Sequence, residues 1–98
     1  MIRAIEYTDF EAFKHDRVTG SYYLGPKDDF QKLDFWYCCP SGSGNIQSIV
    51  VGDSFKPVLS GIATWKLTGQ PGSPTLHPSV NHVGVWHGWL RGGYWESC

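Results

Sequence analysis

Residues 33–51 constrain the fold of this chain more than any other stretch. In LDFWYCC at 33–39, successive side chains point to opposite sides of an extended strand, and both sides are apolar. A strand that is apolar on both sides is typical of the interior of a sheet. PSGSGN at 40–45 has the composition of a turn, and IQSIVV at 46–51 again has strand composition. The stretch therefore predicts a β-hairpin inside a sheet.

A second hairpin is predicted near the end of the chain. VGVWHGWL and YWES flank Arg91-Gly92-Gly93, so residues 80–97 have the pattern of two strands around a glycine-containing turn. The segment 69–79 contains three prolines and two glycines. Proline cannot donate a hydrogen bond to a sheet, so this segment predicts an irregular loop.

The remaining segments add further strands and one short helix. Strand-like composition occurs at 2–7, 21–24 and 61–67. Thr8 and Glu11 have capping-box spacing, which predicts a helix from Asp9 to about His15. With 98 residues, the chain predicts a single mainly β domain over 1–98, with a small antiparallel, sandwich-like sheet.

Composition excludes several classes of protein. Eight Lys and Arg against nine Asp and Glu give a net charge of −1, which argues against nucleic acid as a partner. No run approaches the ~18 apolar residues of a membrane span, and the first residues lack a secretory signal pattern. Three cysteines, two of them adjacent, make no disulfide framework. We therefore expect a cytoplasmic protein that acts on a protein partner, with a homodimer through an exposed strand as an alternative.

Three histidines near the end of the chain raise the question of a metal site. His77, His82 and His87 are spaced five residues apart, and in a regular strand an odd offset places two side chains on opposite faces. We expect His87 to be buried with its ring bonded to backbone carbonyls, and His77 and His82 to be solvated. Cys39, His87 and a further histidine would supply zinc ligands, but no recognised ligand spacing is present.

Several motifs carry a resemblance to a known family. CPSGSG at 39–44, Trp65, PTLHPSV at 74–80 and WHGWLRGGYW at 86–95 together resemble a family of small phage and bacterial proteins of uncharacterised function. Some of its members carry the label ammonia monooxygenase. The family's motifs are CPCGCG, PTLxPS and C-x-x-H-x-x-I/L-x-x-G, and the resemblance covers about residues 34–95.

The resemblance implies a zinc site that this chain has lost. Cys39 and His87 match two of the family's presumed ligands, whereas Ser41 and Ser43 stand where it has cysteines, and residues 84–86 contain no cysteine. A serine hydroxyl stays protonated and is a poor zinc ligand. We therefore expect a metal-free relative without a cofactor, in which the two serines hydrogen-bond the backbone of their own turn.

The sequence offers little that indicates catalysis. The wider GxSxG pattern of a nucleophile elbow is absent around Ser43, and a Cys39–His87 dyad is the remaining catalytic alternative. We predict no catalytic residues and a non-enzymatic accessory or interaction protein of phage or prophage origin. Its binding residues are predicted on the last hairpin: Trp89, Arg91 and Trp95. The alternative function is a small zinc-binding domain that uses Cys39, His87 and His77 or His82.

Overall fold

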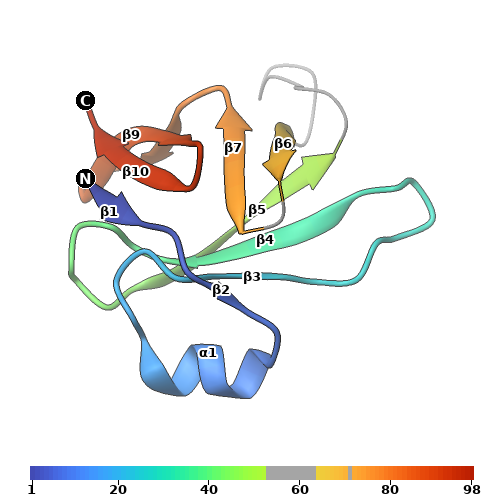
Figure 1. The fold of residues 1–98 in the computed structure, drawn as a ribbon, viewed down its shortest axis with the longest axis horizontal. Helices are drawn as coiled ribbons and strands as arrows, with labels where there is room; N and C mark the ends of the chain where they lie inside the picture. The colour runs from blue at the N-terminus through green and yellow to red at the C-terminus, as the bar shows by residue number, and fades with distance from the viewer. Residues whose placement is uncertain (53–63, 71) are drawn as a thin grey trace.

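The computed structural model describes residues 1–52, 64–70 and 72–98, which form two sheets and one short helix (Figure 1). The four-stranded sheet has the order β1 (Ile2–Arg3), β10 (Tyr94–Ser97), β9 (Trp86–Arg91), β8 (Val80–His82). The six-stranded sheet has the order β2 (Glu6–Tyr7), β3 (Tyr22–Leu24), β4 (Leu33–Cys38), β5 (Ile46–Gly52), β6 (Thr64–Gln70), β7 (Ser73–His77). The predicted mainly β, antiparallel fold is confirmed. Two of the described strand pairs, β2–β3 and β5–β6, are parallel.

The predicted central hairpin is present. β4 and β5 pair from Leu33 opposite Val51 to Cys38 opposite Ile46, and β4 lies between β3 and β5. Phe35 and Tyr37 on β4 are buried, and both belong to the core. The apolar pattern on both sides of this strand therefore identified an interior position.

The first strand-like segment is divided between the two sheets. β1 pairs with β10, and β2 pairs with β3, so the chain crosses from one sheet to the other at the buried Ala4.

The helix α1 (Phe10–Asp16) follows, and its N-cap is Asp9 rather than the predicted Thr8. The Phe10 ring lies 5.0 Å from the Trp36 ring, so the helix covers the outer side of the six-stranded sheet.

The predicted loop at 69–79 is wrong, because this segment contains β7. β7 pairs antiparallel with β6, and Pro74 lies opposite Gly69. The carbonyl of Pro74 accepts a hydrogen bond from Gly93 N at 2.8 Å, so its backbone points away from β6 and the ladder needs no N–H at this position. The predicted strand 61–67 is present from Thr64 onward, and residues 61–63 lie outside the described residues.

The core lies between the two sheets. Trp95 on β10 is 2% exposed, and its Nε1 donates a 2.8 Å hydrogen bond to the Gly20 carbonyl. Its ring packs against the ring of Tyr37 in the other sheet, with the ring centroids 5.2 Å apart.

The last hairpin, β9–β10, turns at Gly92-Gly93 as predicted. No helix among the described residues is long and apolar enough to cross a membrane.

Candidate functional site

The β8–β9 hairpin carries two histidines on opposite faces. In this hairpin Asn81 lies opposite His87, and His82 lies opposite Trp86. Cross-strand partners share a face, whereas successive residues alternate, so His82 and His87 point in opposite directions. The predicted opposite placement is thus confirmed, although two strands joined by a turn at 83–85 produce it, rather than one continuous strand.

His87 faces outward and contacts a serine. The Oγ of Ser79 lies 3.1 Å from the Nε2 of His87. When the imidazole proton is on Nδ1, Nε2 accepts the Ser79 O–H, which is the arrangement that activates a serine for nucleophilic attack. His87 is exposed, so the prediction of a buried histidine bonded to carbonyls is wrong. Among the residues that the structure describes, no carboxylate bonds to its Nδ1, so the described residues form a Ser79–His87 dyad.

Neighbouring strands support both Ser79 and His87. Ser79 directly precedes β8, and its carbonyl accepts a 3.1 Å hydrogen bond from Nε1 of Trp65 on β6. On the other strand, Gly88 separates His87 from Trp89, and a Cβ at Gly88 would clash with the Glu96 carbonyl and would lie 2.6 Å from the Trp86 ring. Glycine at this position therefore lets β9, the strand that carries His87, pack closely on β10.

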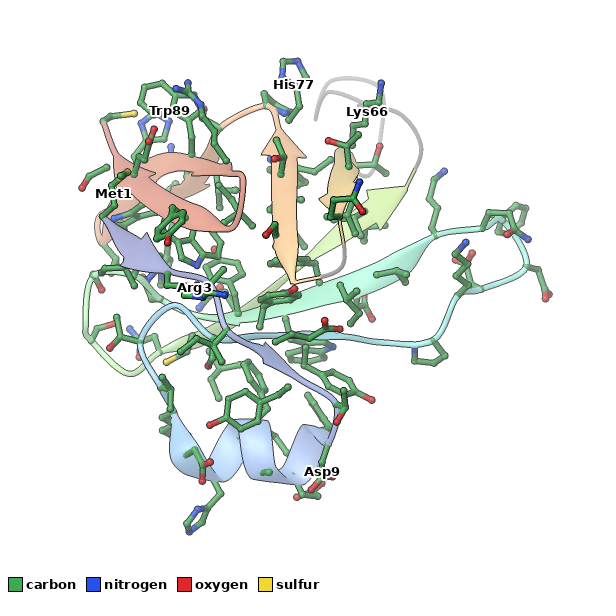
Figure 2. The ribbon with its side chains drawn as sticks, viewed as in Figure 1. Met1, Arg3, Asp9, Lys66, His77 and Trp89 are labelled. Atoms are coloured by element: carbon green, nitrogen blue, oxygen red, sulfur yellow. The ribbon has the colours of Figure 1, made fainter. Side chains whose placement is uncertain are left out.

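A hollow of about 390 Å³ opens beside Ser79. The described residues that line it are Thr75, Leu76, His77, Pro78, Ser79, Trp89 and Arg91. Two larger hollows, of about 420 and 490 Å³, contain no histidine among their lining residues. The serine of the dyad is therefore open to a bound molecule. Figure 2 shows Trp89 and His77 at the same end of the molecule, opposite Asp9 at the start of α1.

The predicted binding residues divide between this hollow and the core. Trp89 and Arg91 both line the hollow, and the Arg91 guanidinium lies over the Trp89 ring at 4.4 Å. Trp95 was predicted on the same surface, but its indole is buried between the sheets and is not available to a partner. The difference arises because Trp95 lies opposite Leu90, on the inner face of the last hairpin.

The second histidine, His82, pairs with a cysteine. His82 Nδ1 lies 3.3 Å from Cys39 Sγ, which also accepts a 3.2 Å hydrogen bond from Ser41 Oγ. Cys39 is fully buried, as is its neighbour Cys38. Burial raises the pKa of the Cys38 thiol, and Arg17 opposes this shift. The structure thus gives Cys39 the partner His82 instead of His87, and the Cys39–His87 dyad considered from the sequence does not form.

The serine turn has the hydrogen bonds that the sequence predicted. Ser41 Oγ accepts from Ser43 N at 3.2 Å, and Ser43 Oγ accepts from Asn45 N at 3.3 Å. The two hydroxyls stabilise the turn that joins β4 to β5.

The zinc ligands considered from the sequence are divided between the two faces of the β8–β9 hairpin. Structural zinc sites are tetrahedral and use thiolate, imidazole or carboxylate ligands. Here Cys39 and His82 lie together, whereas His87 lies on the other face of the hairpin with Ser79. Over residues 1–52, 64–70 and 72–98, no group of three or more His, Cys, Asp or Glu side chains is placed to hold a metal.

Comparison with known families adds to this geometry. A family described as bacterial ubiquitination-like system serine protease (BubE) matches residues 9–98, which is most of the chain. The chain belongs to the BubE family. A search of curated proteins and a search of solved structures each found no match.

Membership in the BubE family contradicts the prediction of a non-enzymatic protein. The family is described by a serine protease activity. The GxSxG pattern is absent around Ser43, but the serine that contacts a histidine is Ser79, in a connection between two strands. The sequence did contain a signal for this pair. Ser79 lies in PTLHPSV and His87 lies in WHGWLRGGYW, and both motifs carry the family resemblance.

Proposed function

We propose that this chain is a serine hydrolase that cleaves a peptide or isopeptide bond, with Ser79 as nucleophile and His87 as general base. The observation that carries the proposal is the 3.1 Å contact between Ser79 Oγ and His87 Nε2 at the edge of an open hollow. Membership in a serine protease family supports the same chemistry. The substrate that we propose is a ubiquitin-like protein joined through a peptide or isopeptide bond, in keeping with the family description.

The dyad supports acyl transfer in two steps. Ser79 Oγ bonds to the scissile carbonyl carbon while its proton passes to His87 Nε2, and the imidazolium then protonates the leaving amine as the C–N bond breaks. In the second step water attacks the acyl ester with His87 again as base. The ester bond breaks, the carboxylic acid leaves, and the proton returns to Ser79.

A fluorophosphonate probe tests this proposal directly, because it phosphonylates activated serines and needs no knowledge of the substrate. We expect intact-mass analysis to show one adduct per chain and peptide mapping to place it on Ser79. Ser79→Ala should remove the adduct, whereas Ser43→Ala, a matched serine in the exposed turn, should keep it. An adduct on another residue, or none on the folded protein, contradicts the proposal.

A further inference from the structure

The hollow beside Ser79 has a basic rim. Arg91 lines the hollow itself. Lys66 on β6 lies opposite His77 on β7, so the two side chains share one face, and both project from the end of the molecule that also bears Trp89 (Figure 2). Among the described residues that line the hollow, there is no carboxylate. This local excess of cationic and donor groups contrasts with the net charge of −1 of the chain.

Arg91 is oriented for recognition of an anion. Its guanidinium lies over the Trp89 ring at 4.4 Å, which holds the plane of the group and leaves N–H donors along its edge. Nη1 contacts Glu96 Oε2 at 3.5 Å, and both side chains are partly exposed. An exposed ion pair of this kind contributes about 0–1 kcal/mol. A carboxylate from a bound molecule can therefore share or replace the contact with Glu96.

The strand position of Arg91 relative to Ser79 matches the spacing of residues in an extended peptide. Ser79 comes one residue before Val80, which lies opposite Gly88, so Trp89 flanks the serine. Arg91 lies two residues further along β9, which is about 7 Å in a strand. An extended substrate with its scissile carbonyl at Ser79 would therefore bring a group within two residues of that bond to Arg91.

We infer that Arg91, stacked on Trp89, is the specificity-determining residue of this site and selects substrates with a carboxylate within two residues of the scissile bond. This inference rests on the proposed function, since it takes Ser79 as the nucleophile. The carboxylate is either an Asp or Glu side chain or the C-terminal carboxylate of a short leaving segment. Both present the same planar anion to the guanidinium.

The test uses internally quenched octapeptides that carry Glu, Gln or Lys at each position in turn, made with a free or an amidated C-terminus. We expect the wild-type kcat/KM to favour Glu over Gln within two residues of the cleaved bond by about ten- to hundredfold. A preference that follows the free C-terminus instead identifies the terminal carboxylate as the source. Arg91→Glu should reverse the preference toward Lys, and Arg91→Lys should keep a reduced preference for Glu. Arg3→Glu makes the same charge change at an exposed arginine outside the hollow and should leave it unchanged.

The same peptides also separate this inference from the proposed function. Their binding to Ser79→Ala, followed by NMR titration of the Arg91 side-chain Nε–H, reports recognition without cleavage. Equal cleavage and equal affinity for Glu, Gln and Lys peptides would overturn the role of Arg91. If the wild type gives no fluorophosphonate adduct but binds the Glu peptides more tightly, only the assignment of Ser79 as nucleophile would be overturned.

Discussion

The β8–β9 hairpin supplies the imidazoles of two nucleophile–imidazole pairs, which have similar distances and different surroundings. Ser79 Oγ and His87 Nε2 are 3.1 Å apart on the outer face, and Cys39 Sγ and His82 Nδ1 are 3.3 Å apart beneath the serine turn. The first pair borders a hollow, whereas Cys39 is fully buried. Distance alone therefore does not identify an active site. Access for a substrate distinguishes the pair suited to catalysis from the pair suited to packing.

The largest expected difference between the two pairs is in reactivity. His87→Gln removes the proposed base, and we expect the rate of fluorophosphonate labelling of Ser79 to fall by about 10³- to 10⁴-fold. His82→Gln changes the matched histidine on the other face, and the rate should fall by less than about tenfold. Time courses of adduct formation by mass spectrometry measure both rates. Similar losses in the two variants would remove the distinction between the pairs.

The buried pair is expected to matter for stability. Cys39→Ala leaves the Ser41 hydroxyl and the His82 ring without their sulfur partner, and we expect it to lower the free energy of unfolding by about 1–3 kcal/mol. Cys98→Ala is the matched control, because Cys98 is exposed and its substitution should have little effect. Urea denaturation followed by tryptophan fluorescence measures both. If the two variants are equally stable, Cys39 has no structural role of this kind.

The smallest expected effect concerns the support of Ser79. Trp65→Phe keeps an aromatic ring on β6 but removes the N–H that bonds the Ser79 carbonyl, which should cost about 1 kcal/mol of stability. Because small displacements of a nucleophile slow its reaction, the labelling rate should fall by about tenfold. Trp36→Phe is the comparison, since Trp36 packs under α1 against Phe10. An equal change in the labelling rates of the two variants would show that the hydrogen bond does not position the serine.

Local patterns predicted the parts of the fold that local contacts determine. The hairpin at 33–51 was identifiable because its two strands and its turn are continuous in sequence and its inner strand is apolar on both sides. The hydrogen bonds of Ser41 and Ser43 were predictable for the same reason, since each hydroxyl bonds to the backbone two residues away. The resemblance to the phage and bacterial family remains a prediction.

The site was not predictable because two faces of one segment were equally apolar. The sequence placed Val83, Val85, His87 and Trp89 together on one side of a single strand. In the structure Val83 and Val85 belong to an exposed turn, and Gly88 and Leu90 form the inner side of β9. With the turn at 83–85 and Gly88 and Leu90 on the inner side of β9, His87 faces outward and contacts Ser79. The position of the turn depends on pairing with β10 and on the core, which a local pattern does not contain.

Among the strands that the structure describes, β8 lies at the edge of its sheet. β8 has three residues and β9 as its strand neighbour, while Trp95 and Leu90 are anchored in the interior. Fraying of such an edge requires less free energy than opening the interior. Warming would thus separate Ser79 from His87 while the rest of the molecule keeps its fold, so the proposed hydrolysis would cease before the protein melts.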